Sequence, residues 1–140
     1  MKIIEFEDKY RDDMIYMVLS AKNAIGRIPK LNEDLLDIKT NYFDKGQPFY
    51  IALDEYDRVI GCIGTKIRDD KLFLSHLFVR YDLKRHGIGS KLLELAESSA
   101  RERGYKEIHV HLGESYLESH IFYPKNGYKE YEKLYMKKEL

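Results

Sequence analysis

KLFLSHLFVRYDLKRHGIGSKLLELAESSARER, residues 71–103, combines the features of a strand, a glycine loop and a helix in one continuous run. Residues 72–79 are apolar and rich in β-forming side chains, which is typical of a buried strand. Residues 84–90, KRHGIGS, form a basic loop with Gly-x-Gly spacing. From Ile88 on, apolar residues recur every three or four positions, which predicts a helix over 88–103 with Gly104 as its left-handed cap.

This order of strand, glycine loop and helix is suited to binding a phosphate group. The first N–H groups of a helix have no intrahelical partner, and the helix dipole makes this end positive. Gly87 and Gly89 let an anion approach the backbone, while Lys84, Arg85 and His86 add cationic side chains. We therefore predict that a phosphate group binds to this loop.

Two common nucleotide loops do not fit the sequence. A dinucleotide fold uses Gly-x-Gly-x-x-Gly, but Leu92 stands where the third glycine is required. A P-loop requires Gly-Lys-Ser/Thr after four intervening residues, and the sequence has no such run.

The loop resembles motif A of the GNAT family of acyl-CoA-dependent N-acetyltransferases, Gln/Arg-x-x-Gly-x-Gly/Ala after a strand that ends in a Leu-x-Val triplet. Lys84 stands at the Gln/Arg position, and Arg85 stands where many members have another glycine. Because the family holds the pyrophosphate mainly through main-chain N–H groups, we expect both residues to be compatible with binding. The resemblance implies cofactor contacts from the triplet and the loop: Leu77, Phe78, Val79, Lys84, Arg85, His86, Gly87, Ile88, Gly89 and Ser90.

Length and composition indicate one domain over residues 1–140 of an ordinary soluble protein, with 44% hydrophobic and 34% charged residues. The 24 basic and 24 acidic residues cancel, which removes the overall electrostatic basis for nucleic-acid binding. The single cysteine, Cys62, is expected to be a small buried side chain in a reducing compartment. The first ten residues, MKIIEFEDKY, are too charged for a signal peptide. No apolar run approaches about 18 residues. We expect a cytoplasmic protein with no membrane partner.

The remaining pattern predicts an α/β (α+β) fold in three layers, with a central mixed, mostly antiparallel sheet and helices on both faces. The run from 72 to 112 is strand, helix, strand, which requires a parallel crossover. The predicted strands are 2–6, 49–53, 59–67, 71–79, 107–112, 128–132 and 134–139. The other predicted helices are 9–22, one from 32 through 42 that stops at Gly46, and 115–123, ended or bent by Pro124.

A second landmark lies near the C-terminus. Residues 122–128, FYPKNGY, resemble motif B of the GNAT family, which has a tyrosine, three residues, then Gly-Phe or Gly-Tyr. The strand and helix order is also that of the family, so the chain is identified as a member along its whole length. Ser119 keeps the small size that the family has where pantetheine passes. Tyr116 replaces the asparagine of many members, so that amide contact is lost.

Acetyl transfer to an amine requires a deprotonated amine, a polarised thioester carbonyl and an acid for the departing thiolate. The resemblance implies that backbone N–H groups near Leu77, Phe78 and Val79 orient pantetheine. It also implies that Tyr123 is the acid and a cofactor contact. A phenol with a pKa of about 10 stays protonated at neutral pH. Tyr123 packed under the last hairpin without a catalytic role is the competing interpretation.

The general base is left open. The family's usual base positions are occupied by Phe73 and Ser75, neither of which is a base. His76 is adjacent, but strand alternation predicts that it faces away from Ser75, which favours a structural role. His111 and Glu114 are candidate bases near the end of a strand that should splay from 72–79, and a water chain is equally compatible.

His109 and His111 share one predicted strand face, but no third ligand is apparent, so we expect no metal. The sequence therefore predicts an acetyl-CoA-dependent N-acetyltransferase acting on a primary amine of a small metabolite or protein. The alternative is a non-catalytic acyl-CoA-binding or sensing module; a nucleic-acid-binding module is disfavoured by the neutral charge. Charges of both signs over 27–34 leave the acceptor open, and the final hairpin offers an edge strand for a homodimer.

Overall fold

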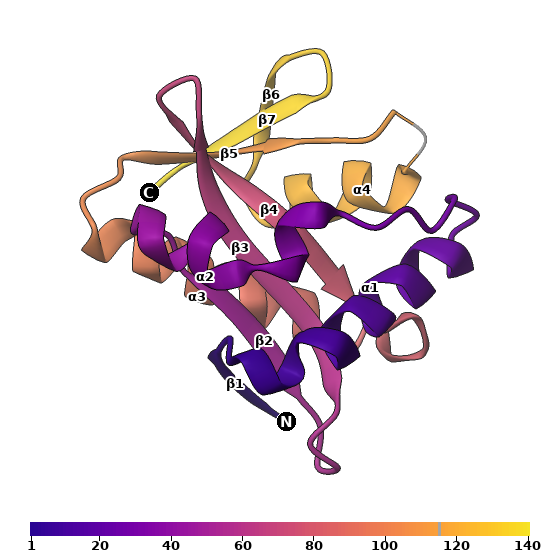
Figure 1. The fold of residues 1–140 in the computed structure, drawn as a ribbon. Coiled ribbons are helices and arrows are strands. Elements are labelled where there is room, and N and C mark those ends of the chain that lie inside the picture. Colours follow the sequence, from indigo (N-terminus) through magenta and orange to yellow (C-terminus); the bar gives the residue numbers. More distant parts are fainter. Residues whose placement is uncertain (115) are drawn as a thin grey trace.

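Residues 1–114 and 116–140 are described by a computed structural model, in which seven strands form one sheet (Figure 1). The order across the sheet is β1-β2-β3-β4-β5-β7-β6; only β4 and β5 pair in parallel, and the other neighbours are antiparallel. The predicted mixed, mostly antiparallel sheet is therefore confirmed. The strands are β1 (Lys2–Glu5), β2 (Phe49–Leu53), β3 (Val59–Arg68), β4 (Lys71–Val79), β5 (Glu107–His111), β6 (Lys129–Glu132) and β7 (Tyr135–Glu139).

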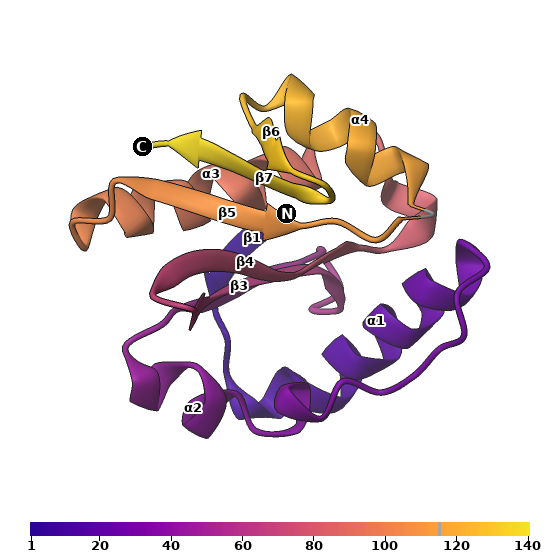
Figure 2. The same ribbon diagram turned by 90° about the horizontal axis from the view of Figure 1, so that it is seen from above.

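Helices cover both faces of the sheet, which gives the three predicted layers (Figure 2). One face carries α1 (Arg11–Ala24) and α2 (Ile38–Asn41), and the other carries α3 (Ile88–Glu102) and α4 (Leu117–Lys125). Each face has its own apolar core, with Met14 and Phe49 in one and Leu92 and Ile108 in the other, all buried. Within the part of the chain that the structure describes, no helix has the length and apolarity needed to cross a membrane.

Two helices end in the same way, each with a glycine in the left-handed conformation. Gly104 and Gly127 have φ of +88° and +92°, a conformation that glycine adopts without strain. At α4, the N–H of Gly127 donates to the Pro124 carbonyl and the N–H of Tyr128 donates to the Tyr123 carbonyl. These two bonds define a Schellman cap. The spacing between Tyr123 and Gly127 is therefore fixed by the end of the helix.

Two predicted helices differ from the structure. The helix expected over 32–46 is wrong as one element and is divided into η2 (Glu33–Leu36), α2 and η3 (Phe43–Lys45). Asp37 causes the break because its backbone leaves the helical region (φ −144°) and its side chain accepts a hydrogen bond from the Thr40 N–H at 3.1 Å.

The predicted start of the last helix, residue 115, lies outside the described residues. The expected end at residue 123 is wrong, because α4 includes Pro124 and continues to Lys125. The proline occupies the last turn, where its missing N–H costs one hydrogen bond and no further turn follows.

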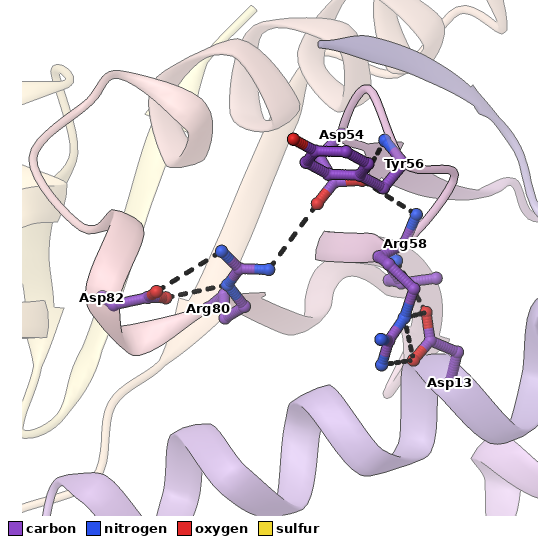
Figure 3. Close-up of polar contacts among 7 residues, drawn as sticks. Asp13, Asp54, Tyr56, Arg58, Arg80 and Asp82 are labelled. Atoms are coloured by element: carbon purple, nitrogen blue, oxygen red, sulfur yellow. Dashed lines mark hydrogen bonds and ion pairs between the residues drawn. The ribbon is translucent and has the colours of Figure 1, made fainter.

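The segment that leads into the glycine loop is held by an ion pair to the β2–β3 turn (Figure 3). Arg80, directly after β4, lies 2.8 Å from Asp82 and 3.6 Å from Asp54. In the same turn Arg58 binds Asp13 of α1 at 2.7 Å. The loop therefore leaves the sheet from a point tied to two other elements.

Candidate active site

The strands β4 and β5 pair over a very short stretch and then separate. Their only paired Cα positions among the described residues are Phe73 and His109, and Figure 1 shows the strands diverging from there. Two adjoining cavities, of about 590 Å³ and about 710 Å³, lie in and beside the gap. The two cavities form one groove, since they share Leu77, Val79, Lys84, Glu118, Ser119 and Tyr123.

The larger cavity is lined by the glycine loop and the start of α3. Arg85 and Gly87 have φ of +69° and +80°, and these left-handed turns bring the chain into the start of α3. In the described structure, the first helical bond runs from the Lys91 N–H to the Gly87 carbonyl, which leaves the preceding N–H groups without backbone partners. Such donors at the positive end of a helix bind anions.

Gly89 leaves space on the floor of this cavity. A Cβ atom placed there would meet the Phe122 ring and the Val79 side chain at 3.6 Å, which is ordinary contact. The fold could therefore accommodate a Cβ atom at Gly89. Because glycine has none, this space is free for a ligand. The predicted cofactor contacts line the groove, with the exception of His86.

Tyr123 of α4 lines both cavities, as do Glu118 and Ser119 of the same helix. Its side chain is buried, and its ring packs edge-on against Phe122 and Tyr128. Burial raises the pKa of Tyr123 well above its usual range, so that the hydroxyl stays protonated. Among residues 1–114 and 116–140 no hydrogen bond occupies this hydroxyl, which leaves a proton donor at the junction of the two cavities.

The smaller cavity is lined on one side by the end of α1 and the loop that follows it. Lys22 is buried, and its ammonium group donates to the Lys30 carbonyl at 2.8 Å and to the Asn32 side chain. Burial, helped by the nearby charge of Arg27, lowers the pKa of Lys22. The Arg27 guanidinium lies 4.2 Å from the centre of the Tyr116 ring. These contacts hold the loop against the segment before α4 and make this side of the groove basic.

His76 lies where regular alternation of β4 breaks. On β3, Cys62 pairs with Phe78 and Gly64 pairs with Ser75, so β4 has two residues opposite one. This is a β-bulge, and His76 takes a left-handed conformation with φ +56°. The expectation that His76 faces away from Ser75 is wrong, because the bulge turns both side chains toward α2.

A hydrogen-bonded network connects these two residues through the α2 layer. The Ser75 hydroxyl lies 2.8 Å from the Tyr42 hydroxyl, which lies 2.6 Å from Asp34 Oδ2. The same carboxylate oxygen lies 2.8 Å from His76 Nε2. Burial opposes ionisation of Asp34, but the hydrogen bonds from His76 and Tyr42 outweigh it and lower the Asp34 pKa to about 2.

The candidate bases at the end of β5 are placed differently from one another. His111 lines the smaller cavity and stacks on Tyr135 at 4.4 Å. Glu114 is outside that lining; its side chain is 77% exposed and lies 3.7 Å from Lys133. His109 is buried between Glu107 and Tyr131, at 2.9 Å from each. In the described part of the chain no three metal-binding side chains gather.

Comparison with known proteins gives the same architecture. A model of the Acetyltransferase (GNAT) family matches residues 11–128. N-acetyltransferase 8 of Homo sapiens is 31% identical over 69% of this chain and 45% of its own length. The probable N-acetyltransferase camello of Xenopus laevis is 41% identical over 54% of this chain and 36% of its own. The chain thus spans less than half the length of these relatives.

Solved structures extend the likeness over nearly the whole chain. A GNAT-family acetyltransferase of Staphylococcus aureus Mu50 has a TM-score of 0.90 at 24% identity, covering 99% of this chain and 98% of that one. PaiA N-acetyltransferase of Thermoplasma acidophilum, solved with coenzyme A, has a TM-score of 0.81 at 19% identity, covering 99% and 98%.

A mixed sheet that opens between β4 and β5 over a glycine loop defines an acetyltransferase-type fold. The chain belongs to the Acetyltransferase (GNAT) family.

Proposed function

We propose that this protein transfers the acetyl group of acetyl-CoA to a primary amine of a small metabolite or of a protein. One observation carries the proposal: a single groove joins the anion site at the start of α3 to the basic cavity beneath the α1 loop, with Tyr123 at the junction. An anionic cofactor and an amine are thereby brought together at a proton donor.

The residues present fit coenzyme A along this groove. The diphosphate would be held by the N–H groups at the start of α3 and by Lys84 and Arg85. The pantetheine arm would follow β4 from Val79 to Leu77, past the small side chain of Ser119. When bound, acetyl-CoA supplies an activated thioester. Burial keeps the Tyr123 hydroxyl protonated at neutral pH. Tyr123 would then be available to give its proton to the departing sulfur.

Structural neighbours support an amine acceptor without specifying it. An aminoglycoside 6'-N-acetyltransferase complexed with coenzyme A has a TM-score of 0.75, and a ribosomal-protein-alanine N-acetyltransferase has 0.79. Their acceptors differ in kind although their folds agree. We therefore assign acceptor choice to the parts of the smaller cavity outside the cofactor path, chiefly Lys22, Arg27 and Asn32.

Ligand titration tests the cofactor site. Acetyl-CoA, coenzyme A and NAD are titrated by calorimetry into the wild type, Gly89→Glu and Gly89→Gln. We expect micromolar binding of the two coenzyme A ligands and none of NAD. Glutamine should weaken binding at least tenfold by filling the space at Gly89, and glutamate further, because its charge repels the diphosphate. Equal acetyl-CoA affinity in all three proteins would exclude this site.

Turnover tests the reaction. Thiol release from acetyl-CoA is followed with an aminoglycoside, a diamine, an amino acid and a peptide with N-terminal alanine. Release that depends on one of these amines supports acetyl transfer. A folded protein that binds acetyl-CoA but acetylates none of them would instead support the non-catalytic binding module.

Two further predictions concern the oligomeric state of the protein and its location in the cell. The predicted homodimer would form along β6, which is the edge strand at the C-terminal end of the sheet and has four exposed residues. Sedimentation of the wild type, with an edge variant carrying Glu130→Pro as the control, tests it. A cytoplasmic location stays a prediction, which fractionation of cells tests.

A further inference from the structure

We propose that His76 is the general base of acetyl transfer and that Asp34 is the residue that positions it. The inference rests on the acetyl transfer proposed above and supplies the group that takes the proton from the acceptor amine. It is carried by the hydrogen-bond network on the α2 side of β4 and by the position of His76 in the wall of the smaller cavity.

The network determines which imidazole nitrogen is basic. The ionised Asp34 carboxylate only accepts hydrogen bonds, so Nε2 of His76, 2.8 Å away, carries a proton and donates it. The Tyr42 hydroxyl donates to the same carboxylate at 2.6 Å and therefore accepts from Ser75. Neutral His76 is thus fixed as the tautomer with a lone pair on Nδ1. Within the described chain no hydrogen bond occupies Nδ1.

The bulge gives His76 its access to the reacting groups. A regular strand would place this side chain on the opposite face of the sheet from Asp34. With φ +56°, His76 instead joins Leu77 and Tyr123 in lining the same cavity, and its side chain keeps 13% exposure. An amine in this cavity would therefore lie beside an oriented base that belongs to the strand expected to hold the thioester.

His111 lines the same cavity and is the competing base. It stacks on Tyr135, and no carboxylate pairs with it in the part of the chain that is described. A paired carboxylate stabilises the imidazolium ion that forms when a histidine takes a proton. His76 has this partner, and so the geometry favours His76.

The protons balance as follows. An alkylammonium group gives one proton to Nδ1 of His76, which later passes it to water. The amine nitrogen forms a bond to the acetyl carbon, and the bond from that carbon to sulfur breaks. Tyr123 gives its proton to sulfur. The second amine proton is lost as the amide forms and restores the Tyr123 hydroxyl. One proton per turnover is released to solvent, as conversion of an ammonium ion and a thioester to an amide and a thiol requires.

Several elements contribute charged or titratable groups to the cavity and to the network that surround the imidazole. They are Lys22 of α1, Arg27 of the following loop, Asp34 of η2, Tyr42 after α2, Cys62 and Lys66 of β3, His111 of β5 and Tyr123 of α4.

The first test is independent of turnover. The five histidines of the wild type and of Asp34→Asn are titrated by NMR, with His76 assigned from His76→Asn. Loss of the carboxylate removes an opposite charge beside the ring, so we expect the His76 midpoint to move to lower pH while the His111 midpoint stays unchanged. An unchanged His76 midpoint would overturn the positioning role of Asp34.

The second test uses the amine that the wild type acetylates best in the panel above. We expect His76→Asn to lower kcat/KM for that amine by about 10²-fold or more, with acetyl-CoA affinity retained. Asparagine is chosen because it tolerates the left-handed backbone of this position. His111→Asn tests the competing base and should lower kcat/KM less than His76→Asn does. Glu130→Gln, on the exposed strand β6, is the control, with an expected change of less than about threefold. In Asp34→Asn, the acidic limb of the pH profile should move with the His76 midpoint.

The outcomes separate the two proposals. If the folded wild type binds acetyl-CoA but acetylates no amine, acetyl transfer itself is overturned. If the wild type turns over and His76→Asn keeps its kcat/KM, only the role of His76 is overturned. A large loss in His111→Asn with none in His76→Asn would give the role to His111.

Discussion

Lys84 and Glu118 form an ion pair across the groove, with 2.6 Å between Nζ and Oε2. Lys84 belongs to the loop that leads to α3, and Glu118 belongs to α4, so the pair joins the two walls at a position that lines both cavities. In this arrangement the carboxylate would compete for the ammonium group with the diphosphate of the proposed cofactor.

Removing this competition should strengthen cofactor binding. In Glu118→Gln, Lys84 is released and one negative charge is lost, so we expect the Kd for coenzyme A to fall about three- to tenfold. The gain should shrink at high salt, since salt screens exposed charges. Glu130→Gln, on the exposed strand β6, is the control and should leave the Kd unchanged. A weaker Kd in Glu118→Gln would mean that the carboxylate supports the site.

The Tyr123 hydroxyl should affect catalysis and not stability. Phenylalanine keeps the ring that packs against Phe122 and Tyr128. We expect Tyr123→Phe to lower kcat about 10- to 10²-fold, with acetyl-CoA affinity within about twofold and Tm unchanged. Tyr56→Phe, at an exposed position, is the control. An unaltered kcat would assign protonation of the thiolate to water.

Asp34 should make the stability of the fold depend on pH. Its pKa is lowered from 3.8 to about 2, so its contribution is present above pH 3.8 and is lost as the pH falls toward 2. A difference of this size corresponds to about 2 kcal/mol. We therefore expect Asp34→Asn to be less stable than the wild type by up to about 2 kcal/mol between pH 5 and 7. Urea unfolding should show the gap closing below about pH 4.

Cys62 should report unfolding. The thiol is fully buried in β3, donates to the His76 carbonyl at 3.2 Å, and has its pKa raised to about 12 by burial. A thiol reagent at pH 8 should therefore label the native protein only at the rate of opening, and the urea-unfolded protein within seconds. Fast labelling of the native protein would show that β3 and β4 separate locally.

The glycine loop, the crossover and the Gly104 cap of α3 could be predicted because each depends on neighbours in the sequence. The apolar period from Ile88 and the glycine at 104 predict α3 to within one residue of its observed end at Glu102. Cys62 was likewise expected to be buried, and it is.

The proton network at His76 could not be predicted in this way. His76 and Asp34 are 42 positions apart, and the period-two rule fails at a bulge. The break at Asp37 within 32–46 could not be predicted either. This break sets the direction from which Asp34 and Tyr42 reach the sheet. Asp and Asn are common at such caps, so the residue type alone did not distinguish a cap from a first helical turn.

The separation of β4 and β5 has a consequence for the order of events in the reaction. The groove is lined at one end by the start of α3 and at the other by the α1 loop, on opposite faces of the sheet. Acetyl-CoA and the amine would therefore enter from opposite sides, and neither would have to leave before the other arrives. The proposed transfer would then be direct, within a ternary complex, and we expect double-reciprocal plots of initial rate to intersect and no acetylated enzyme to accumulate.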